Sequence, residues 1–267
     1  MYADMQRDGT GETDEMHIAV AKQSFETAIE LNRESGIAWL GLARVQRLLG
    51  KGAEAKETLT RARRLLPDED PSAAAESALL CLDEGDLEGA TQHIDAASIR
   101  GEGAIVSYVR GNIAANQGHL KAAASHFDAA IETDPTHVRA RLNRASIHMA
   151  SGNAQGALDD ANVLLELAPG LALAKLRRAE ANMMLSNWSD SKTDLEQIVA
   201  DAPHHHHALT QLAACYISME RPEKAEAPLN EALRLAPEHT DAWHQRGLLY
   251  LSLIHISEPT RRYAISY

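Results

Sequence analysis

The chain has 267 residues, of which 45% are hydrophobic but only 4% aromatic, and its formal net charge is -12. A sequence-independent nucleic-acid binder needs clustered Lys and Arg to displace phosphate counterions, so this acidic balance argues against that class. No apolar run approaches the roughly 18 residues of a membrane span, which argues against direct membrane insertion.

The first segment, Met1–Met16, is rich in Asp and Glu and contains Gly9 and Gly11. It does not resemble a signal peptide, and we expect residues 1–16 to be frayed or disordered. Ala19–Leu31 follows, with Ala21, Phe25 and Ala28 on one helical face. This spacing predicts an amphipathic helix.

The stretch Gly36–Glu69 predicts a pair of antiparallel helices. Small residues would let the two helices approach closely, a glycine would end the first helix in a left-handed turn, and a proline would stop the second. The residues in question are Trp39, Leu42, Ala43, Gly50, Ala55, Leu59, Ala62 and Pro67. Pro71–Gly103 keeps most of this pattern but has Glu102 where a proline would stand, so we expect a looser junction at Ser98–Gly103.

From Gly103 onward two residue classes repeat at one fixed step of 34 residues, the period of stacked helix pairs. The prolines are Pro135, Pro169, Pro203 and Pro237, and the small residues are Gly111, Ala145, Ala179, Ala213 and Gly247. Pro228 lies seven residues into a second helix, which predicts a kink or a late helix start, whereas Pro222 is tolerated in a first turn. Cys81 and Cys215 fall in apolar segments and are expected to be buried.

These offsets of bulky, small and proline residues resemble the tetratricopeptide repeat family over residues 17–250, with about six repeats and a truncated one. The resemblance implies an all-α fold, a right-handed superhelical α-solenoid of helix-turn-helix repeats. It also implies a non-enzymatic scaffold that binds a peptide or helix of a partner protein in its concave groove. The Ala-rich units are similar to bacterial members.

The resemblance places the partner-binding residues on the first helix of each repeat, where their side chains are expected to be exposed. These residues are Arg44, Arg47, Tyr108, Asn112, Asn116, Arg139, Asn143, Met149, Arg177, Met183 and Met184, with Glu180 among them. Arg and Asn could hydrogen-bond a peptide or a carboxylate, and Met offers an adaptable apolar surface. Some family members clamp the C-terminal carboxylate of chaperones, but Tyr108 and Leu173 stand here where that clamp has lysines.

Catalytic motifs, cofactor motifs and paired metal-binding cysteines are absent from the sequence. The run His204-His205-His206-His207 could capture a metal, but four consecutive residues cannot all reach one ion from regular backbone, so we predict no metal site. An alternative function stays open, in which this array is the N-terminal substrate-targeting region of an enzyme such as a glycosyltransferase or sulfotransferase. The partner, the oligomeric state and the choice between cytoplasm and periplasm also stay open.

The last residues, Leu251–Tyr267, resemble the in-frame translation of a transposase-based sequencing adapter. We therefore expect the natural sequence to depart from this one after Tyr250. The helix predicted over Thr240–Tyr250 would then lack its partner helix. Because terminal repeats need a polar cap, we expect this end to fray or self-associate.

Overall fold

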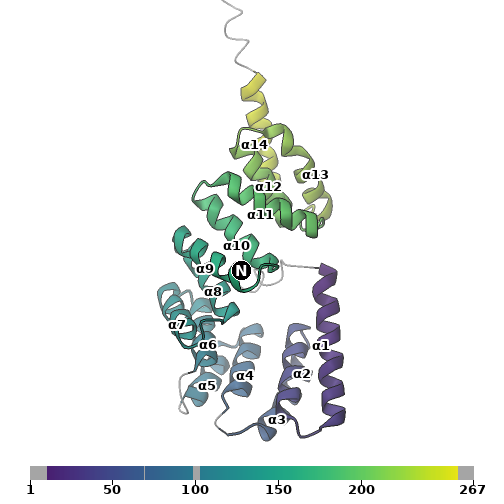
Figure 1. Ribbon diagram of the computed structural model, residues 1–267, viewed down its shortest axis with the longest axis vertical. Helices are drawn as coiled ribbons and strands as arrows, with labels where there is room; N and C mark the ends of the chain where they lie inside the picture. Colours follow the sequence, from purple (N-terminus) through teal and green to yellow (C-terminus); the bar gives the residue numbers. More distant parts are fainter. Residues whose placement is uncertain (1–10, 69, 99–102, 258–267) are drawn as a thin grey trace, which may run out of the picture. The chain divides into compact units, whose positions relative to one another are not determined.

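The computed structural model describes residues 11–68, 70–98 and 103–257, and over these residues the chain is all-α. It contains fourteen α-helices, one 3-10 helix and no strand within that part of the chain (Figure 1). The helices form two compact units, one within residues 11–151 and one within residues 152–257. The predicted all-α solenoid of helical hairpins is confirmed in each unit.

The first unit consists of an entry helix, three helical hairpins and one further helix. In order these are α1 (Gly11–Leu31), α2 (Gly36–Leu48) and α3 (Gly52–Leu65), α4 (Ser72–Asp83) and α5 (Leu87–Ser98), α6 (Ala104–Asn116) and α7 (Leu120–Thr133), and α8 (Val138–Ala150). The two helices of each hairpin pack against one another, and each hairpin packs against the next (Figure 1). Each element thus buries its apolar stripe against its sequence neighbours.

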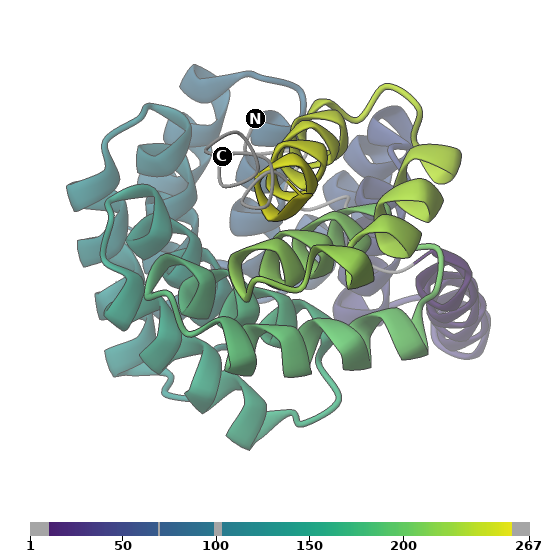
Figure 2. The same cartoon turned by 90° about the horizontal axis from the view of Figure 1, so that it is seen from above.

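The second unit continues the same pattern. Its helices are α9 (Ala154–Leu167), α10 (Ala172–Met184) and α11 (Trp188–Asp201), α12 (His206–Ser218), the 3-10 helix η2 (Pro222–Lys224), α13 (Glu226–Leu235) and α14 (Thr240–Ser257). The terminal helix α14, yellow in both views, packs against α12 and α13 (Figures 1 and 2).

The small residues of the sequence pattern lie where two helices meet. Ala43 and Ala62, in the first hairpin, are fully buried. A Cβ atom on Gly111 would lie 2.5 Å from Cε1 of Phe127, and one on Gly41 would lie 2.3 Å from Cε1 of Phe25. Real Cβ contacts are never that short, so a larger residue at either glycine would push the aromatic ring and its helix away.

A residue with positive φ ends the first helix of each hairpin, as predicted for Gly50, whose φ is 71°. Gly85, Gly118 and Gly152 adopt the same conformation. Two residues with side chains also do so in the second unit, Ser186 with a φ of 62° and Glu220 with a φ of 58°. The left-handed region disfavours any residue with a Cβ, so these two turns carry strain that the glycine turns do not.

Pro228 produces a late helix start rather than a kink. The chain first forms η2, with Pro222 in its first position, and α13 begins only at Glu226. Pro228 is therefore the third residue of α13, where a backbone N–H would have no i−4 carbonyl acceptor within the helix. Both proline predictions agree with this arrangement.

The first and last helices of the described residues are longer than the helices predicted from the sequence. Helix α1 begins at Gly11, and α14 runs through Ser257 with Trp243, Leu251 and Ile254 exposed. Residues 1–10, 99–102 and 258–267 lie outside the described part, and with them most of the junction predicted to be loose. The boundaries at residues 16 and 250 stay predictions. None of the described helices combines the length and apolarity that a membrane crossing requires.

Candidate functional site

Side chains of neighbouring first helices meet across each unit, and we call this surface the first-helix face. In the first unit it is formed by α2, α4, α6 and α8, and in the second by α10 and α12. Its members are Arg44, Arg47, Glu76, Tyr108, Asn112, Asn116, Arg139, Asn143 and Met149 in the first unit, and Arg177, Glu180, Met183, Met184, His207 and Gln211 in the second.

Between α2 and α4 the face is held by ion pairs. Nε of Arg44 lies 3.1 Å from Oε2 of Glu76, and Nε of Arg47 lies 2.7 Å from Oε1 of the same carboxylate. Arg47 also donates to Oδ2 of Asp83 at 2.7 Å. Burial by itself would lower the pKa of Arg47, but Glu76 and Asp83 raise it above its ordinary value. Arg47 is thus engaged within the protein, whereas the Arg44 side chain remains 40% exposed.

Between α6 and α8 the face is built from amides. Nδ2 of Asn143 donates to Oδ1 of Asn112 at 2.6 Å, and Nδ2 of Asn116 donates to the backbone oxygen of Asn112 at 2.9 Å. The Asn112–Asn143 bond uses one donor and one acceptor. Nδ2 of Asn112 and Oδ1 of Asn143 take no part in this bond.

Around this amide pair lie an aromatic contact and an exposed cation. The ring of Tyr108 has its centroid 6.1 Å from that of Phe127 and 4.9 Å from that of His137. Arg139 is exposed one helical turn before Asn143, so both residues lie on one side of α8. Met149 is half-buried near the end of the same helix.

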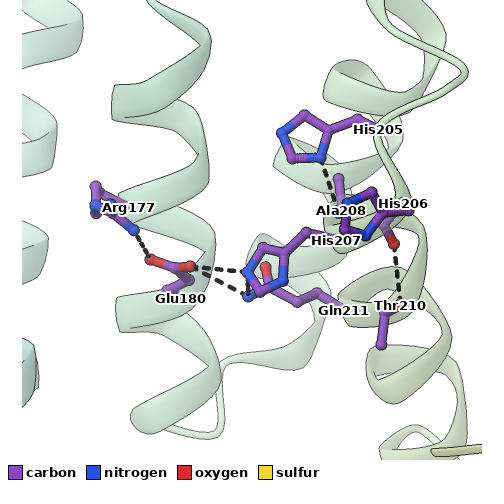
Figure 3. Close-up of polar contacts among 8 residues, drawn as sticks. All are labelled: Arg177, Glu180, His205, His206, His207, Ala208, Thr210 and Gln211. Carbon is purple, nitrogen blue, oxygen red and sulfur yellow. Dashed lines mark hydrogen bonds and ion pairs between the residues drawn. The ribbon is translucent and has the colours of Figure 1, made fainter. Parts of the chain in front are cut away.

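Between α10 and α12 the face is a network of an ion pair and hydrogen bonds around the carboxylate of Glu180, which we call the closed network (Figure 3). Nη1 of Arg177 lies 2.6 Å from Oε2 of Glu180, and Nε2 of Gln211 donates to Oε1 of Glu180 at 3.2 Å. Nε2 of His207 lies 3.4 Å from Oε1 of Glu180 and 2.8 Å from Nε2 of Gln211.

The ionisation of Glu180 follows from these partners. Burial raises the pKa of this carboxyl, but the bond to His207, the charge of Arg177 and the bond to Gln211 outweigh burial and bring the pKa to about 2. Glu180 is therefore ionised at neutral pH, and its negative charge is balanced inside the protein.

The two networks occupy equivalent repeat positions two 34-residue steps apart. Asn112 corresponds to Glu180, and Asn143 corresponds to Gln211. The amide-to-acceptor bond between neighbouring first helices is therefore the same bond in both places. His207 takes the position of Arg139.

The expectation that all predicted binding residues are exposed is wrong at four positions. Tyr108, Asn112, Asn143 and Arg177 are buried, with exposed fractions of 4%, 6%, 9% and 5%. Contacts with neighbouring helices cover these side chains: Asn112 and Asn143 bond across α6 and α8, and Tyr108 packs near Phe127 and His137. The expected exposure holds at Asn116, Arg139 and Met184. Four further residues are half-buried, namely Arg44, Arg47, Met149 and Met183.

Glu76, His207 and Gln211 were missed as members of the face. The 34-residue register would have found His207 and Gln211, which hold the second and sixth positions of the repeat that begins at His206. Glu76 holds the sixth position of the repeat that begins at Pro71, so counting from the start of that repeat would have found it as well.

The side chains of the histidine run make contacts with different partners. His205 accepts a bond from the backbone of Ala208, and His207 turns toward Glu180 (Figure 3). His206 packs edge-on against His239, with ring centroids 4.9 Å apart. No three His, Cys, Asp or Glu side chains in the described ranges are placed to share a metal ion. Cys81 and Cys215 are buried, as predicted.

A pocket of about 300 Å³ lies elsewhere in the first unit, between the α3–α4 connection and the end of α5. Arg63, Asp68, Asp70 and Ala97 are among its lining residues. It contains none of the first-helix-face side chains.

Known structures with the same fold are numerous. The chain is similar to the hetero-tetramer Cut9–Hcn1 of the APC/C, at 16% identity and a TM-score of 0.69 over 91% of this chain and 46% of that one. It thus spans less than half the length of that relative. It is also similar to pilF of Pseudomonas aeruginosa, at 16% identity and a TM-score of 0.68 over 80% of this chain and 98% of that one. MamA from Desulfovibrio magneticus RS-1 has 17% identity and a TM-score of 0.58, over 65% and 98% of the two chains.

At these identities the similarities show the fold. No curated protein matches the chain. Two sequence models described as tetratricopeptide repeat do match it, one over residues 108–172 and the other over residues 17–80 and 183–246. Together with the hairpins and their 34-residue register, these matches show that the chain belongs to the tetratricopeptide repeat family.

Proposed function

We propose that the chain is a protein-interaction scaffold that binds an extended peptide segment of a partner on the α6–α8 part of its first-helix face. Membership in the tetratricopeptide repeat family supports the general role in protein–protein interaction. The proposal assigns the chain no catalytic step and no cofactor.

The observation that carries the proposal is the amide pair. Asn112 and Asn143 hold one another at 2.6 Å across two helices, which fixes both side chains before any ligand arrives. A peptide group needs one donor for its carbonyl and one acceptor for its N–H. Nδ2 of Asn112 and Oδ1 of Asn143 supply both, and binding requires little further ordering of side chains.

Charge adds a preference to this geometry. Arg139 is exposed on the same side of α8 as Asn143, and Asn116 is exposed one turn after Asn112 on α6. Arg is suited to carboxylates because its guanidinium can donate two parallel bonds. We infer that the bound segment carries an acidic side chain or a terminal carboxylate beside the peptide group that the two asparagines hold.

The test is selection from a phage-displayed library of random peptides with the full chain as bait. Peptides enriched by the parent chain are then measured against Asn143→Ala and Arg139→Glu. The matched control is Arg64→Glu, which makes the same charge change on an exposed residue of the second helix α3. The proposal predicts weaker binding in both face variants and parent-like binding in the control.

Two outcomes would contradict the proposal. One is a library that yields no enriched peptide. The other is enrichment that the face variants retain at the level of the Arg64→Glu control, which would move the binding surface away from α6 and α8.

A further inference from the structure

Three first helices begin with the same unusual cap, an imidazole. Nδ1 of His137 accepts from the backbone N–H of Ala140 at 3.1 Å, which caps α8. Nδ1 of His205 accepts from Ala208 at 3.2 Å and caps α12. Nδ1 of His239 accepts from Ala242 at 3.2 Å and caps α14. All three histidines precede their helix by one residue in the 34-residue register.

A non-titrating version of this cap is present in the same chain. Oγ of Ser35 accepts from the backbone N–H of Ala38 at 3.3 Å and caps α2. A hydroxyl keeps its acceptor lone pairs across the whole physiological pH range. Helix α2 is therefore an internal reference for the three histidine-capped helices.

The chemistry of imidazole limits the histidine caps to one protonation state. Nδ1 can accept a hydrogen bond only while it carries no proton, so the proton of the neutral ring must be on Nε2. Protonation of Nδ1 removes the acceptor and also places a positive charge at the positive end of the helix dipole. The backbone N–H of the third helical residue has no i−4 carbonyl within the helix, so it loses the acceptor that the imidazole supplied.

We propose that His137, His205 and His239 form a set of pH-sensitive helix caps, so that mild acidification opens the first turns of α8, α12 and α14 while α2 stays capped.

The surroundings of His137 favour the capping state at neutral pH. The Tyr108 ring of α6 covers its imidazole, Asp134 lies in the preceding turn, and Arg139 lies on α8. Burial lowers the pKa of His137, Asp134 partly opposes this, and Arg139 lowers the pKa further. Since the folded pKa is below the ordinary value near 6.5, this cap stabilises the fold above about pH 6.5 and is lost as pH falls through the folded pKa.

The two caps of the second unit share their surroundings with other titrating groups. The His207 ring lies 6.5 Å from that of His205 and 6.1 Å from that of His239, and the His206 ring lies 4.9 Å from that of His239. Glu180 and Arg177 on α10 face His207, and Asp241 is in the first turn of α14.

The test is native-state hydrogen exchange, followed by NMR on the full chain at about pH 7.5 and about pH 5.5, on either side of the histidine titration. After correction for intrinsic exchange rates, protection of the Ala140, Ala208 and Ala242 amides should fall about 3- to 10-fold relative to Ala38, the range expected for loss of a cap. Equal changes at all four amides would overturn the proposal.

A triple variant separates loss of the caps from general acid destabilisation. His137→Asn, His205→Asn and His239→Asn keep a good capping side chain that does not titrate. The three amides should then behave like Ala38 at both pH values. If the triple variant kept the parent's pH dependence, the imidazoles would not be its source.

One consequence rests on the proposed function. The first turn of α8 contains Arg139, so opening this turn should weaken peptide binding at low pH. The exchange experiment uses no ligand, and its result therefore stands or falls separately from peptide binding.

Discussion

The α6–α8 and α10–α12 regions of the first-helix face have the same backbone register but differ in what they offer a ligand. Between α6 and α8, Asn112 and Asn143 form a neutral pair with unused donors and acceptors. Between α10 and α12, the same two positions hold Glu180 and Gln211, and Arg177 closes the network. The comparison teaches that the same repeat position can leave hydrogen-bonding atoms unused between two helices or engage them within the protein, depending on the neighbouring side chains.

The largest expected effect is on stability of the closed network. Glu180→Gln leaves the guanidinium of Arg177 without its carboxylate partner, and Arg177 as a residue is only 5% exposed. Breaking a buried pair by removing one partner costs about 3 kcal/mol, and we expect a loss of this order in the second unit. Hydrogen exchange of the α10 and α12 amides is the suitable measurement, because repeat arrays do not unfold as one unit.

A double variant sharpens this prediction. Arg177→Met with Glu180→Met replaces both charges by apolar side chains and should recover most of the lost stability. If Glu180→Gln alone had no measurable effect, Arg177 would be reaching solvent, and the network would not be closed.

The pH dependence of the closed network is the next largest effect. The pKa of Glu180 is lowered from its ordinary value of 4.5 to about 2, so the folded state holds the ionised form more strongly than the unfolded state does. The resulting stability is present above about pH 4.5 and is lost as pH falls toward 2. The difference in stability between the parent and Glu180→Gln should therefore shrink below pH 4.5. A difference that stays constant down to pH 2 would mean that Glu180 is not the titrating group.

Substitution in the Asn112–Asn143 pair should lower the affinity for a peptide more than it lowers the stability of the fold. Asn143→Ala removes a neutral hydrogen bond worth about 1 kcal/mol to the fold. It should also weaken binding of a selected peptide about tenfold, because a peptide N–H loses its acceptor. Gln211→Ala, the equivalent change two repeats later, should leave peptide affinity at the parent level. Calorimetric titration of the selected peptide into both variants measures this difference in affinity. Equal losses of affinity in Asn143→Ala and Gln211→Ala would contradict the prediction.

The smallest expected effect concerns the hairpin turns. Gly50, Gly85 and Gly118 hold the left-handed positions of the first unit, whereas Ser186 and Glu220 hold two in the second. Ser186→Gly and Glu220→Gly relieve a conformational cost of about 1 kcal/mol each, although glycine also makes the unfolded chain more flexible. We expect a net gain of a few tenths of a kcal/mol per site in denaturant titrations, with Gly118→Ala as the opposite change. A loss of stability in Ser186→Gly would show that the turn is not strained.

Much of the fold could be predicted from the sequence because it depends on local rules. The 34-residue step predicted the small residues of the later repeats. The conformational rules for glycine and proline predicted the turn at Gly50 and either a kink or a late helix start at Pro228, without knowledge of tertiary contacts. Side-chain partners could not be predicted in this way. The register gives the position of Arg177, but it does not reveal that Arg177 pairs with Glu180 and is buried. The burial of Asn112 and Asn143 was missed for the same reason.

The most direct test of the account follows the side-chain amides themselves. A selected peptide is titrated into the 15N-labelled full chain, and the NH2 resonances of Asn112, Asn143 and Gln211 are recorded. The account predicts large shifts for Asn112 and Asn143 and an unchanged Gln211, because Nε2 of Gln211 already lies within hydrogen-bonding distance of Glu180 and His207. Shifts at Gln211 with both asparagines unchanged would contradict it and would place the binding surface on α10 and α12.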